Sequence, residues 1–354
     1  MRSLIDIRDL SVEELYELLD TAADITEHPE KFADMCRGKK LATLFFEPST
    51  RTRLSFEAAM LELGGSVLSV PGSSNSSAVK GESLADTARV VSCYAAIIAV
   101  LHPAEGSAQV VAQNASIPVI NGGDGGHCHP TQTLADLLTI YREKGRLDHL
   151  TVGLCGDLKY GRTVHSLIGA LSRYEGNRFV LISPTELKLP DYVKRDAAGK
   201  NGPDFHETTQ LEEALPGLDI LYMTRIQQER FEDPSEYERL RDVYILTPEK
   251  LKAANENCIV MHPLPRVNEI SAAVDRDPRA CYFKQVLNGK IMRKALILKL
   301  LGDRGTFERT GVAVPGLRCK NPKCVCASER ETEPLFTLSE NGEARCLYCE
   351  TAAR

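Results

Sequence analysis

The apolar positions of this chain fall into short continuous runs separated by segments with helical spacing. The run from Leu41 to Phe46 has the length and composition of a buried strand. Further runs of strand length lie at 67–70, 96–101, 150–154, 179–182, 220–223 and 258–261, and one more ends at Ile120. This alternation of strand and helix is typical of parallel sheets with helices on both faces, so the sequence predicts an α/β fold.

The length of the chain sets its domain organisation. Its 354 residues are enough for two ordinary domains and a small appendage. The sequence predicts a first domain over residues 1–145 and a second over 146–287, each with a mainly parallel sheet covered by helices. A helix over 288–305 is expected to complete the first domain, and residues 306–354 form a separate C-terminal unit.

Charge and composition exclude several classes of protein. The formal net charge is −6 and no basic run reverses it, which argues against a nucleic-acid-binding surface. No stretch reaches the roughly 18 apolar residues of a membrane span. The first residues lack the apolar core of a secretion signal. We therefore expect a cytoplasmic protein that binds neither nucleic acid nor membrane.

Hydroxyl side chains and an arginine meet at the start of a predicted helix. Ser49, Thr50, Arg51 and Thr52 follow the first strand after Glu47-Pro48. The free backbone N–H groups and the positive dipole end of a helix favour an anion, and an arginine adds a bidentate fork. The pattern predicts a phosphate site, with a capped helix and solvent-facing arginines as the alternative.

A glycine-rich turn over residues 121–126 leads to His127, His129 and Gln132, just before another predicted helix. Paired histidines suggest a metal ion, but no third ligand follows at a recognisable spacing. A histidine that donates a polarising hydrogen bond to a substrate is the favoured interpretation.

Polar residues also follow the strands of the second domain. Arg162, Arg225 and the pair Leu264-Pro265 come directly after apolar runs. In open parallel sheets, ligands bind beyond the carboxyl ends of the strands, so we expect these residues to line a cleft between the two domains. The glycines of residues 156–161 do not form a G-x-G-x-x-G fingerprint, which disfavours a dinucleotide site.

Five of the eleven cysteines lie between residues 319 and 349. Cys319 with Cys324, and Cys346 with Cys349, are two close pairs about twenty residues apart, as tetrahedral zinc requires. Cys326 is left over. A disulfide pair is the alternative, and a reducing compartment disfavours it. The segment is too short to hold a core alone, so a structural Zn²⁺ ion is expected to be a condition of its folding.

Five segments, taken in order, resemble the aspartate carbamoyltransferase family. They are residues 49–53, 129–132, 156–163, 224–227 and 262–265. The resemblance to the catalytic chain covers about residues 1–305, and the C-terminal cysteines resemble the zinc domain of the regulatory chain. Ornithine carbamoyltransferase shares the first segment, but its cysteine beside the last histidine is absent because Pro263 follows His262.

The resemblance implies transfer of a carbamoyl group from carbamoyl phosphate to L-aspartate in de novo pyrimidine biosynthesis, with no cofactor for catalysis. Catalysis is assigned to Arg51, Thr52 and His129. Carbamoyl phosphate is assigned to Ser49, Thr50, Arg51, Thr52, Ser76, His129, Gln132, Leu264 and Pro265, and aspartate to Lys80, Arg162, Arg225 and Gln227. The resemblance also implies a homotrimer with shared active sites, because the loop with Ser76 and Lys80 reaches the neighbouring subunit. The zinc unit is expected to join subunits into a higher assembly.

One position departs from the family pattern. The family has an arginine immediately before His102-Pro103, where it contacts the carbonyl oxygen and the phosphate, and this chain has Leu101. Loss of one such donor typically lowers a rate by about 10² to 10³. Two alternatives follow: a carbamoyltransferase for another amine acceptor, and a non-catalytic assembly subunit. For the cysteine-rich unit, a nucleic-acid-binding zinc ribbon is the competing interpretation, and its mixed charges disfavour it.

Overall fold

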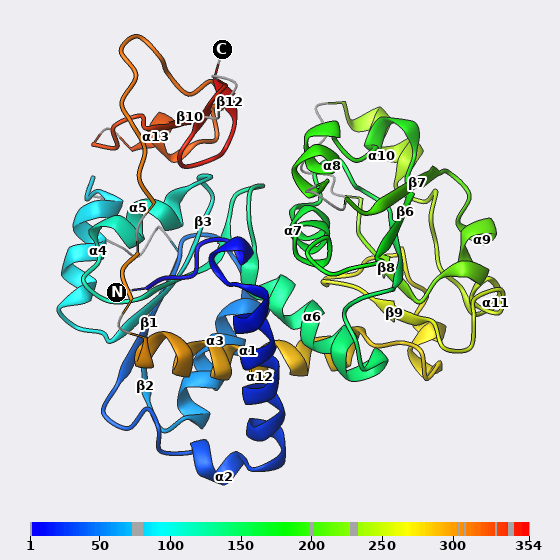
Figure 1. The fold of residues 1–354 in the computed structure, drawn as a ribbon, viewed down its shortest axis with the longest axis horizontal. Helices are drawn as coiled ribbons and strands as arrows, with labels where there is room; N and C mark the ends of the chain where they lie inside the picture. Colours follow the sequence, from blue (N-terminus) through cyan, green and yellow to red (C-terminus); the bar gives the residue numbers. More distant parts are fainter. Residues whose placement is uncertain are drawn as a thin grey trace. The chain divides into compact units, whose positions relative to one another are not determined.

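The computed structural model describes residues 2–72, 81–198, 202–226, 233–303, 305–307, 309–329, 331–338 and 343–353. The chain divides into two compact units, visible in Figure 1. Unit 1 comprises Met1–Thr131 and Lys290–Arg354, and unit 2 comprises Gln132–Gly289. Each unit contains a parallel sheet with helices packed on it, which confirms the predicted α/β class. The domain boundaries given above stay a prediction.

Unit 1 is built on a four-stranded parallel sheet in the order β2-β1-β3-β4. Its strands are β1 (Lys40–Phe45), β2 (Ser66–Pro71), β3 (Ile97–His102) and β4 (Val119–Asp124). Its helices are α1 (Val12–Glu27), α2 (Pro29–Phe32), α3 (Thr50–Glu62), α4 (Leu84–Ser92) and α5 (Ser107–Asn114), with a 3-10 turn at Ile7–Asp9. Helix α1 begins with the capping box that the sequence predicts, because Ser11 and Glu14 each accept from the other's backbone N–H.

Strand β4 corrects one expectation. The sequence predicted that the strand would end at Ile120 and that the glycines would form a turn. The strand instead continues to Asp124, with His102 of β3 paired to Asp124 across a bulge. Gly123 has a φ of 133°, which glycine adopts without steric cost. Pairing with a buried neighbour strand thus outweighs the low strand propensity of these glycines.

Unit 2 is built on a five-stranded parallel sheet in the order β7-β6-β5-β8-β9. The strands are β5 (Thr151–Cys155), β6 (Arg178–Ile182), β7 (Asp204–Thr208), β8 (Ile220–Met223) and β9 (Ile259–Met261). The helices are α6 (Pro130–Lys144), α7 (Arg162–Leu171), α8 (Asp191–Ala197), α9 (Leu211–Ala214), α10 (Pro234–Leu240) and α11 (Pro248–Leu251), with 3-10 turns at Thr185–Leu187, Leu215–Gly217 and Ala272–Arg276. Helix α12 (Tyr282–Gly302) begins earlier than the predicted residue 288 and passes from unit 2 into unit 1.

The C-terminal segment, residues 306–354, is called the tail below. It contains the short helix α13 (Val325–Ser328) and an antiparallel sheet of β10 (Phe336–Leu338), β11 (Ala344–Cys346) and β12 (Ala352–Ala353). The tail packs on the α5 side of unit 1 (Figure 1). Its side chains Phe336, Leu347 and Tyr348 share one apolar core with α4, α5 and β3, so the core of the tail is continuous with that of the first sheet and its helices.

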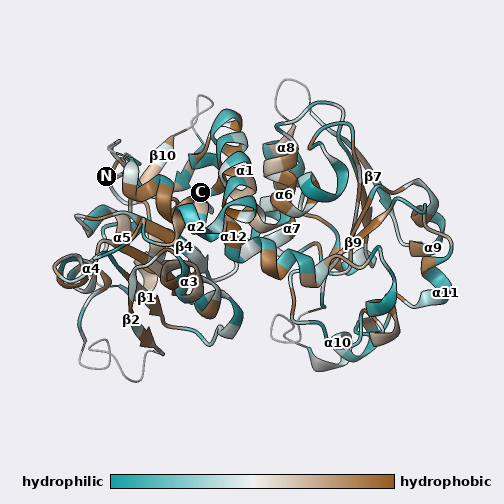
Figure 2. Cartoon of the chain, turned by 90° about the horizontal axis from the view of Figure 1, so that it is seen from below, coloured by the Kyte–Doolittle hydropathy of each residue, from teal (hydrophilic) through white to brown (hydrophobic). Residues whose placement is uncertain are grey.

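Buried apolar side chains line both the strands and the inward faces of the helices in each unit. Figure 2 shows apolar colouring concentrated on interior strands and inward helix faces, and hydrophilic colouring on the outer helices and loops. Across the described part of the chain, no helix combines the length and hydrophobicity needed to cross a membrane.

Candidate functional site

The first predicted segment lies at the N-terminus of α3, as expected. Ser49 is the N-cap, and its side chain accepts no hydrogen bond from the helix that it precedes. The first turn of α3 contains no acidic residue, and Thr50 and Arg51 are exposed. Although the side chain of Arg51 remains accessible, desolvation by neighbouring protein atoms lowers the pKa of its guanidinium from the usual value. Hydroxyls, backbone N–H groups and a guanidinium therefore meet at a helix end that can accept an anion.

The loops after β1, β3 and β4 lie at one edge of the unit 1 sheet, because these strands are parallel neighbours. Leu101 is the next-to-last residue of β3 and is buried, with its Cβ near the position that a side chain on Gly122 would take. His102 follows it, and its Nδ1 accepts from the backbone N–H of Ala104 at 3.0 Å. Burial lowers the pKa of His102 to about 4, so the ring is neutral at physiological pH.

His129 lies directly before α6 and is buried, with Nδ1 3.5 Å from the Thr131 hydroxyl. The same hydroxyl accepts from Arg293 of α12 at 3.3 Å. The loop that precedes His129 is held by Asp124, whose side chain accepts from the backbone N–H groups of Cys128 at 2.9 Å and Gly106 at 2.8 Å. The position of His129 thus depends on a fully buried carboxylate that the sequence analysis did not single out.

In unit 2, three predicted segments follow three neighbouring parallel strands. Arg162 opens α7 after β5, Arg225 follows β8, and Leu264-Pro265 follow β9. The sheet order β5-β8-β9 places their loops at one edge. Arg162 and Arg225 are both partly buried. Two cations on adjacent loops are suited to a ligand with two carboxylates.

Gln132 is oriented by Asp136, one turn further along α6. Its Nε2 donates to Asp136 Oδ1 at 2.8 Å. Because a carboxylate can only accept, this contact fixes which end of the amide carries the nitrogen. The side-chain oxygen of Gln132 is therefore the end that can accept from an amide N–H of a ligand.

Three predicted site residues, Ser76, Lys80 and Gln227, lie outside the described residues. Their assigned contacts stay predictions.

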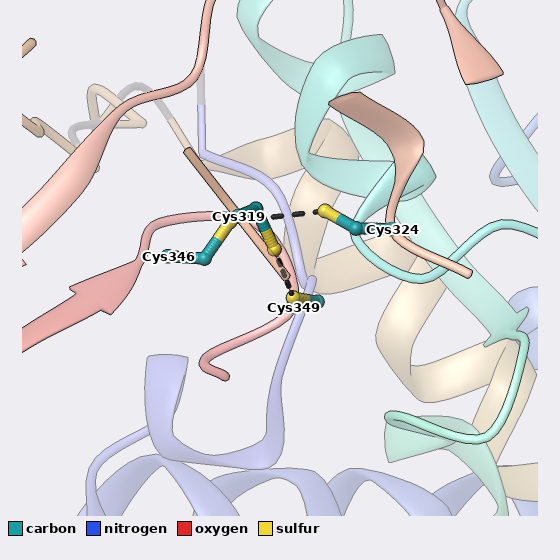
Figure 3. Close-up of side chains that lie close together, drawn as sticks. All are labelled: Cys319, Cys324, Cys346 and Cys349. Carbon is teal, nitrogen blue, oxygen red and sulfur yellow. Dashed lines mark hydrogen bonds between the residues drawn. The ribbon is translucent and has the colours of Figure 1, made fainter. Parts of the chain in front are cut away.

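The tail brings together the four cysteines predicted as metal ligands. The sulfur atoms of Cys319, Cys324, Cys346 and Cys349 all lie within 4.8 Å of one another (Figure 3). Cys319 and Cys349 are 3.5 Å apart, and Cys324 and Cys346 are 3.7 Å apart. Four thiols converging from two chain segments form a closed set of four soft ligands, which fits a tetrahedral metal ion. Cys326 Sγ lies 3.2 Å from Cys324 Sγ and is not a member of this set.

The tail contacts the rest of unit 1 at Glu105, which lies between β3 and α5. Its backbone N–H donates to the backbone carbonyl oxygen of Lys323 at 2.8 Å, and its own carbonyl oxygen accepts from the backbone N–H of Val325 at 2.8 Å. Its carboxylate accepts from Asn321 Nδ2 at 2.6 Å and from the backbone N–H of Gly126 at 3.3 Å. One residue therefore contacts both the segment around Cys324 and the loop that leads to His129.

A second contact joins the tail to this loop. Glu350, next to Cys349, pairs with Arg8 Nη2 at 2.5 Å and lies 3.9 Å from His127 Nε2. His127 Nδ1 is 3.0 Å from Asp124, and with Cys128 these residues lie close enough to share an ion. Asp124 already accepts from backbone N–H groups, so a charge network explains the group without a metal.

Sequence reasoning missed several residues that position the predicted ones. Asp124, Asp136 and Glu269 are isolated acidic residues in the sequence, and no local motif marks them. All three are buried and hydrogen-bonded to a predicted segment or its loop. A single acidic residue within an apolar run, such as Asp136 in α6, was the one available sequence signal, because a charged residue at a buried position needs a partner.

Family models match nearly the whole chain. Residues 2–142 match the carbamoyl-P binding domain of aspartate/ornithine carbamoyltransferase, and residues 148–300 match the Asp/Orn binding domain. Residues 310–354 match the metal binding domain of the aspartate carbamoyltransferase regulatory chain.

Named relatives and solved structures agree with these matches. The aspartate carbamoyltransferase catalytic subunit of Clostridium novyi is 60% identical over 301 residues, covering 85% of this chain and 98% of the relative. That of Finegoldia magna is 58% identical over 303 residues, covering 86% and 99%. The catalytic subunit of M. jannaschii aspartate transcarbamoylase superposes with a TM-score of 0.80 at 48% identity, covering 86% of this chain and 99% of that one. The Trypanosoma cruzi enzyme in complex with N-(phosphonacetyl)-L-aspartic acid has a TM-score of 0.80 at 36% identity, covering 85% and 96%.

Proposed function

Because the chain belongs to the aspartate/ornithine carbamoyltransferase family, we propose that it transfers the carbamoyl group of carbamoyl phosphate to L-aspartate. The products are N-carbamoyl-L-aspartate and phosphate, and the reaction serves de novo pyrimidine biosynthesis. The observation that carries the proposal is the placement of the family segments, because each follows the carboxyl end of a parallel strand. The segments after β1 and β4, and the loop at Leu101 after β3, belong to the first sheet. The other three segments follow β5, β8 and β9 of the second sheet.

The chemistry requires positioning and charge stabilisation more than covalent work by the protein. The neutral amine of aspartate attacks the carbonyl carbon, the bond to the phosphate oxygen breaks, and the nitrogen releases a proton. Arg51, with the hydroxyls and N–H groups at the start of α3, holds the phosphate and stabilises the charge that it gains. Thr52 and His129 donate to the carbonyl oxygen, which becomes negative in the tetrahedral intermediate.

The remaining contacts orient the two substrates. The Gln132 side-chain oxygen and the backbone carbonyls of Leu264 and Pro265 accept from the carbamoyl amide, consistent with the Gln132 orientation set by Asp136. Arg162 and Arg225 bind the carboxylates of aspartate. Ser76, Lys80 and Gln227 keep their assigned roles as predictions from the family pattern.

Leu101 makes this assignment testable. The experiment measures N-carbamoyl-L-aspartate formation by the metal-loaded wild-type protein, beside Leu101→Arg and a Leu101→Met control of similar volume. We expect turnover in the wild type and a higher rate in Leu101→Arg, by up to about 10² to 10³. Product from Leu101→Arg alone favours the assembly-subunit alternative. No product from any of the three, together with turnover of ornithine or another amine, overturns aspartate as the acceptor.

The tail cysteines are proposed to hold Zn²⁺ as a structural ion, through Cys319, Cys324, Cys346 and Cys349. The all-thiolate, four-ligand set supports zinc and leaves no open position for catalysis. Described cysteines are free thiols throughout, which fits a reducing, cytoplasmic location. Metal content measured by mass spectrometry tests the identity of the ion.

We also propose a homotrimer with shared active sites. Leu54 and Leu61 on α3 and Leu68 on β2 are large apolar side chains exposed in the single chain, and their exposure supports contact with another subunit. The tail offers a further surface for a higher assembly, and neither nucleic acid nor membrane is a partner. Sedimentation of the metal-loaded protein tests the trimer.

A further inference from the structure

The loop after β9 contains a leucine in an unfavourable backbone conformation. Leu264 has a φ of 55°, in the left-handed region that residues with a Cβ rarely adopt. Such a conformation persists only where neighbouring groups hold it. Leu264 is also one of the two residues whose carbonyl groups are proposed to bind the carbamoyl amide, so what holds it bears on the site.

The backbone of Leu264 is hydrogen-bonded to the buried ring of His262. Its Nδ1 accepts from the backbone N–H of Leu264 at 2.7 Å. Pro263 between them has no N–H, so the first backbone donor after the histidine is that of Leu264. The same arrangement occurs at the end of β3, where His102 accepts from Ala104 across Pro103.

Glu269 fixes the tautomer that this contact needs. Because Nδ1 of His262 accepts, the ring proton must sit on Nε2, which lies 2.7 Å from Glu269 Oε1. The other carboxylate oxygen accepts from the backbone N–H groups of Val267 at 3.0 Å and Asn268 at 3.1 Å. The buried carboxylate therefore orients the ring and also shapes the rest of the loop.

The backbone of His262 is linked to Gln132 through two further buried side chains. Its N–H donates to Gln285 Oε1 at 3.0 Å, and Gln285 Nε2 donates to Asp136 Oδ1 at 2.5 Å. Asp136 is the same residue that orients Gln132. Tyr222 donates to its second oxygen at 2.9 Å. The two proposed acceptors of the carbamoyl amide, Gln132 and the loop at Leu264, are thus joined by one chain of hydrogen bonds within unit 2.

We propose that His262 is a positioning residue, which presents the Leu264 and Pro265 carbonyl groups to the carbamoyl amide by accepting from the Leu264 N–H. This inference rests on the proposed function, since it concerns how the amide of carbamoyl phosphate is held. It assigns His262 no contact with either substrate and no proton transfer.

Two amide variants separate the two nitrogen atoms of the ring. In His262→Asn the side-chain oxygen takes approximately the place of Nδ1, so the contact to Leu264 is kept and the contact to Glu269 is lost. In His262→Gln the amide reaches the place of Nε2, so the contact to Glu269 is kept and that to Leu264 is lost. The variants are otherwise similar in polarity and volume.

We expect His262→Asn to keep a KM for carbamoyl phosphate within about threefold of wild type. His262→Gln should raise that KM and lower kcat, so that kcat/KM for carbamoyl phosphate falls by about tenfold to a hundredfold, because a misplaced binding group lowers the rate on this scale. The KM for aspartate should change little. Equal effects of the two variants, or a larger effect of His262→Asn, overturn the proposal.

A measurement that does not depend on turnover distinguishes this inference from the proposed function. Amide hydrogen exchange at residues 262–266 should stay slow in His262→Asn and become faster in His262→Gln. If the wild type forms no product, the proposed function fails, while the exchange result still decides the His262 contact. Should His262→Gln not fold, imidazole ¹⁵N spectra of the wild type decide it, because a ring protonated on Nδ1 cannot accept from Leu264.

Discussion

The Glu105 carboxylate accepts from Asn321 Nδ2 at 2.6 Å, and this contact joins the cysteine-rich tail to the loop between β3 and α5. Its other oxygen accepts from Gly126, in the loop before His129. The tail is therefore linked, through the Glu105 carboxylate, to the loop that leads to His129, a proposed catalytic residue. Gly106, which follows Glu105, has its Cα against Tyr348, and a Cβ there would lie 2.4 Å from the Tyr348 Cβ.

The first prediction concerns this junction. Glu105→Ala removes the acceptors of the partly buried Asn321 and Gly126 donors, so we expect a loss of about 0.5–1.5 kcal/mol in the free energy of unfolding. Glu105→Gln keeps one acceptor and should lose less. Urea unfolding of the metal-loaded protein measures both, and exposed Glu213, on α9 of unit 2, provides the Glu213→Ala control. A Glu105→Ala variant as stable as the control contradicts the role of the junction.

The second prediction concerns the metal. Cys346→Ser removes one of four ligands and should abolish stoichiometric zinc binding, whereas Cys326→Ser should keep about one Zn²⁺ per chain. Because Phe336 and Tyr348 of the tail share the core of unit 1, metal loss should also lower the melting temperature of unit 1 and speed proteolysis of the tail. Metal analysis and thermal unfolding of the two variants test this. Equal zinc loss in both variants means that the ligand set is wrong.

The third prediction is a pH dependence of stability. Burial holds the pKa of His102 at about 4 in the folded protein, against about 6.5 when unfolded. Between these values the unfolded chain binds a proton that the folded chain does not, so this contribution is present above pH 6.5 and is lost as the pH falls to 4. Since the ring is partly exposed, we expect a slope of about 1 kcal/mol per pH unit or less.

His102→Asn is the matched variant for this measurement, because its side-chain oxygen can still accept from Ala104 but cannot be protonated. Its stability should depend less on pH between 6.5 and 4.5 than that of the wild type. Comparison of the two proteins at each pH removes effects that they share, including protonation of the metal ligands. Parallel curves contradict the assignment.

Local patterns in the sequence predicted most strands of the two parallel sheets, and the two errors, at β7 and at the end of β4, have physical reasons. Each interior strand is an apolar run, so β5, β8 and β9 fall within a residue of their predicted positions. Strand β7 was missed because it lies at the edge of its sheet and no residue of it is fully buried. The last part of β4 was taken as a turn because its glycines carry no strand signal, and only pairing with β3 makes it a strand.

The candidate site divides in the same way. Residues within a motif, such as Ser49 to Thr52, were predicted because neighbours in sequence are neighbours at a helix N-terminus. Asp124, Asp136 and Glu269 were not predicted, because the sequence around a single acidic residue does not identify the residue to which it will hydrogen-bond. The contact from Glu269 to His262 depends on how the loop after β9 folds back. Such contacts depend on tertiary structure and produce no periodic pattern of apolar residues in the sequence.

The last prediction concerns the N-terminus of α3. Arg51→Gln should lower kcat/KM for carbamoyl phosphate by about 10² to 10³ and weaken inhibition by inorganic phosphate, because a guanidinium contributes charge and a fork of donors that an amide lacks. Arg37→Gln is the matched control: Arg37 is also in unit 1, its side chain is 79% exposed, and its partner is Asp34 at 3.2 Å. Steady-state rates and phosphate inhibition constants check both variants. If the inhibition constant of phosphate is the same in Arg51→Gln as in the control, the phosphate does not bind at this helix end, and the remaining hydroxyls of the segment lose their assigned role with it.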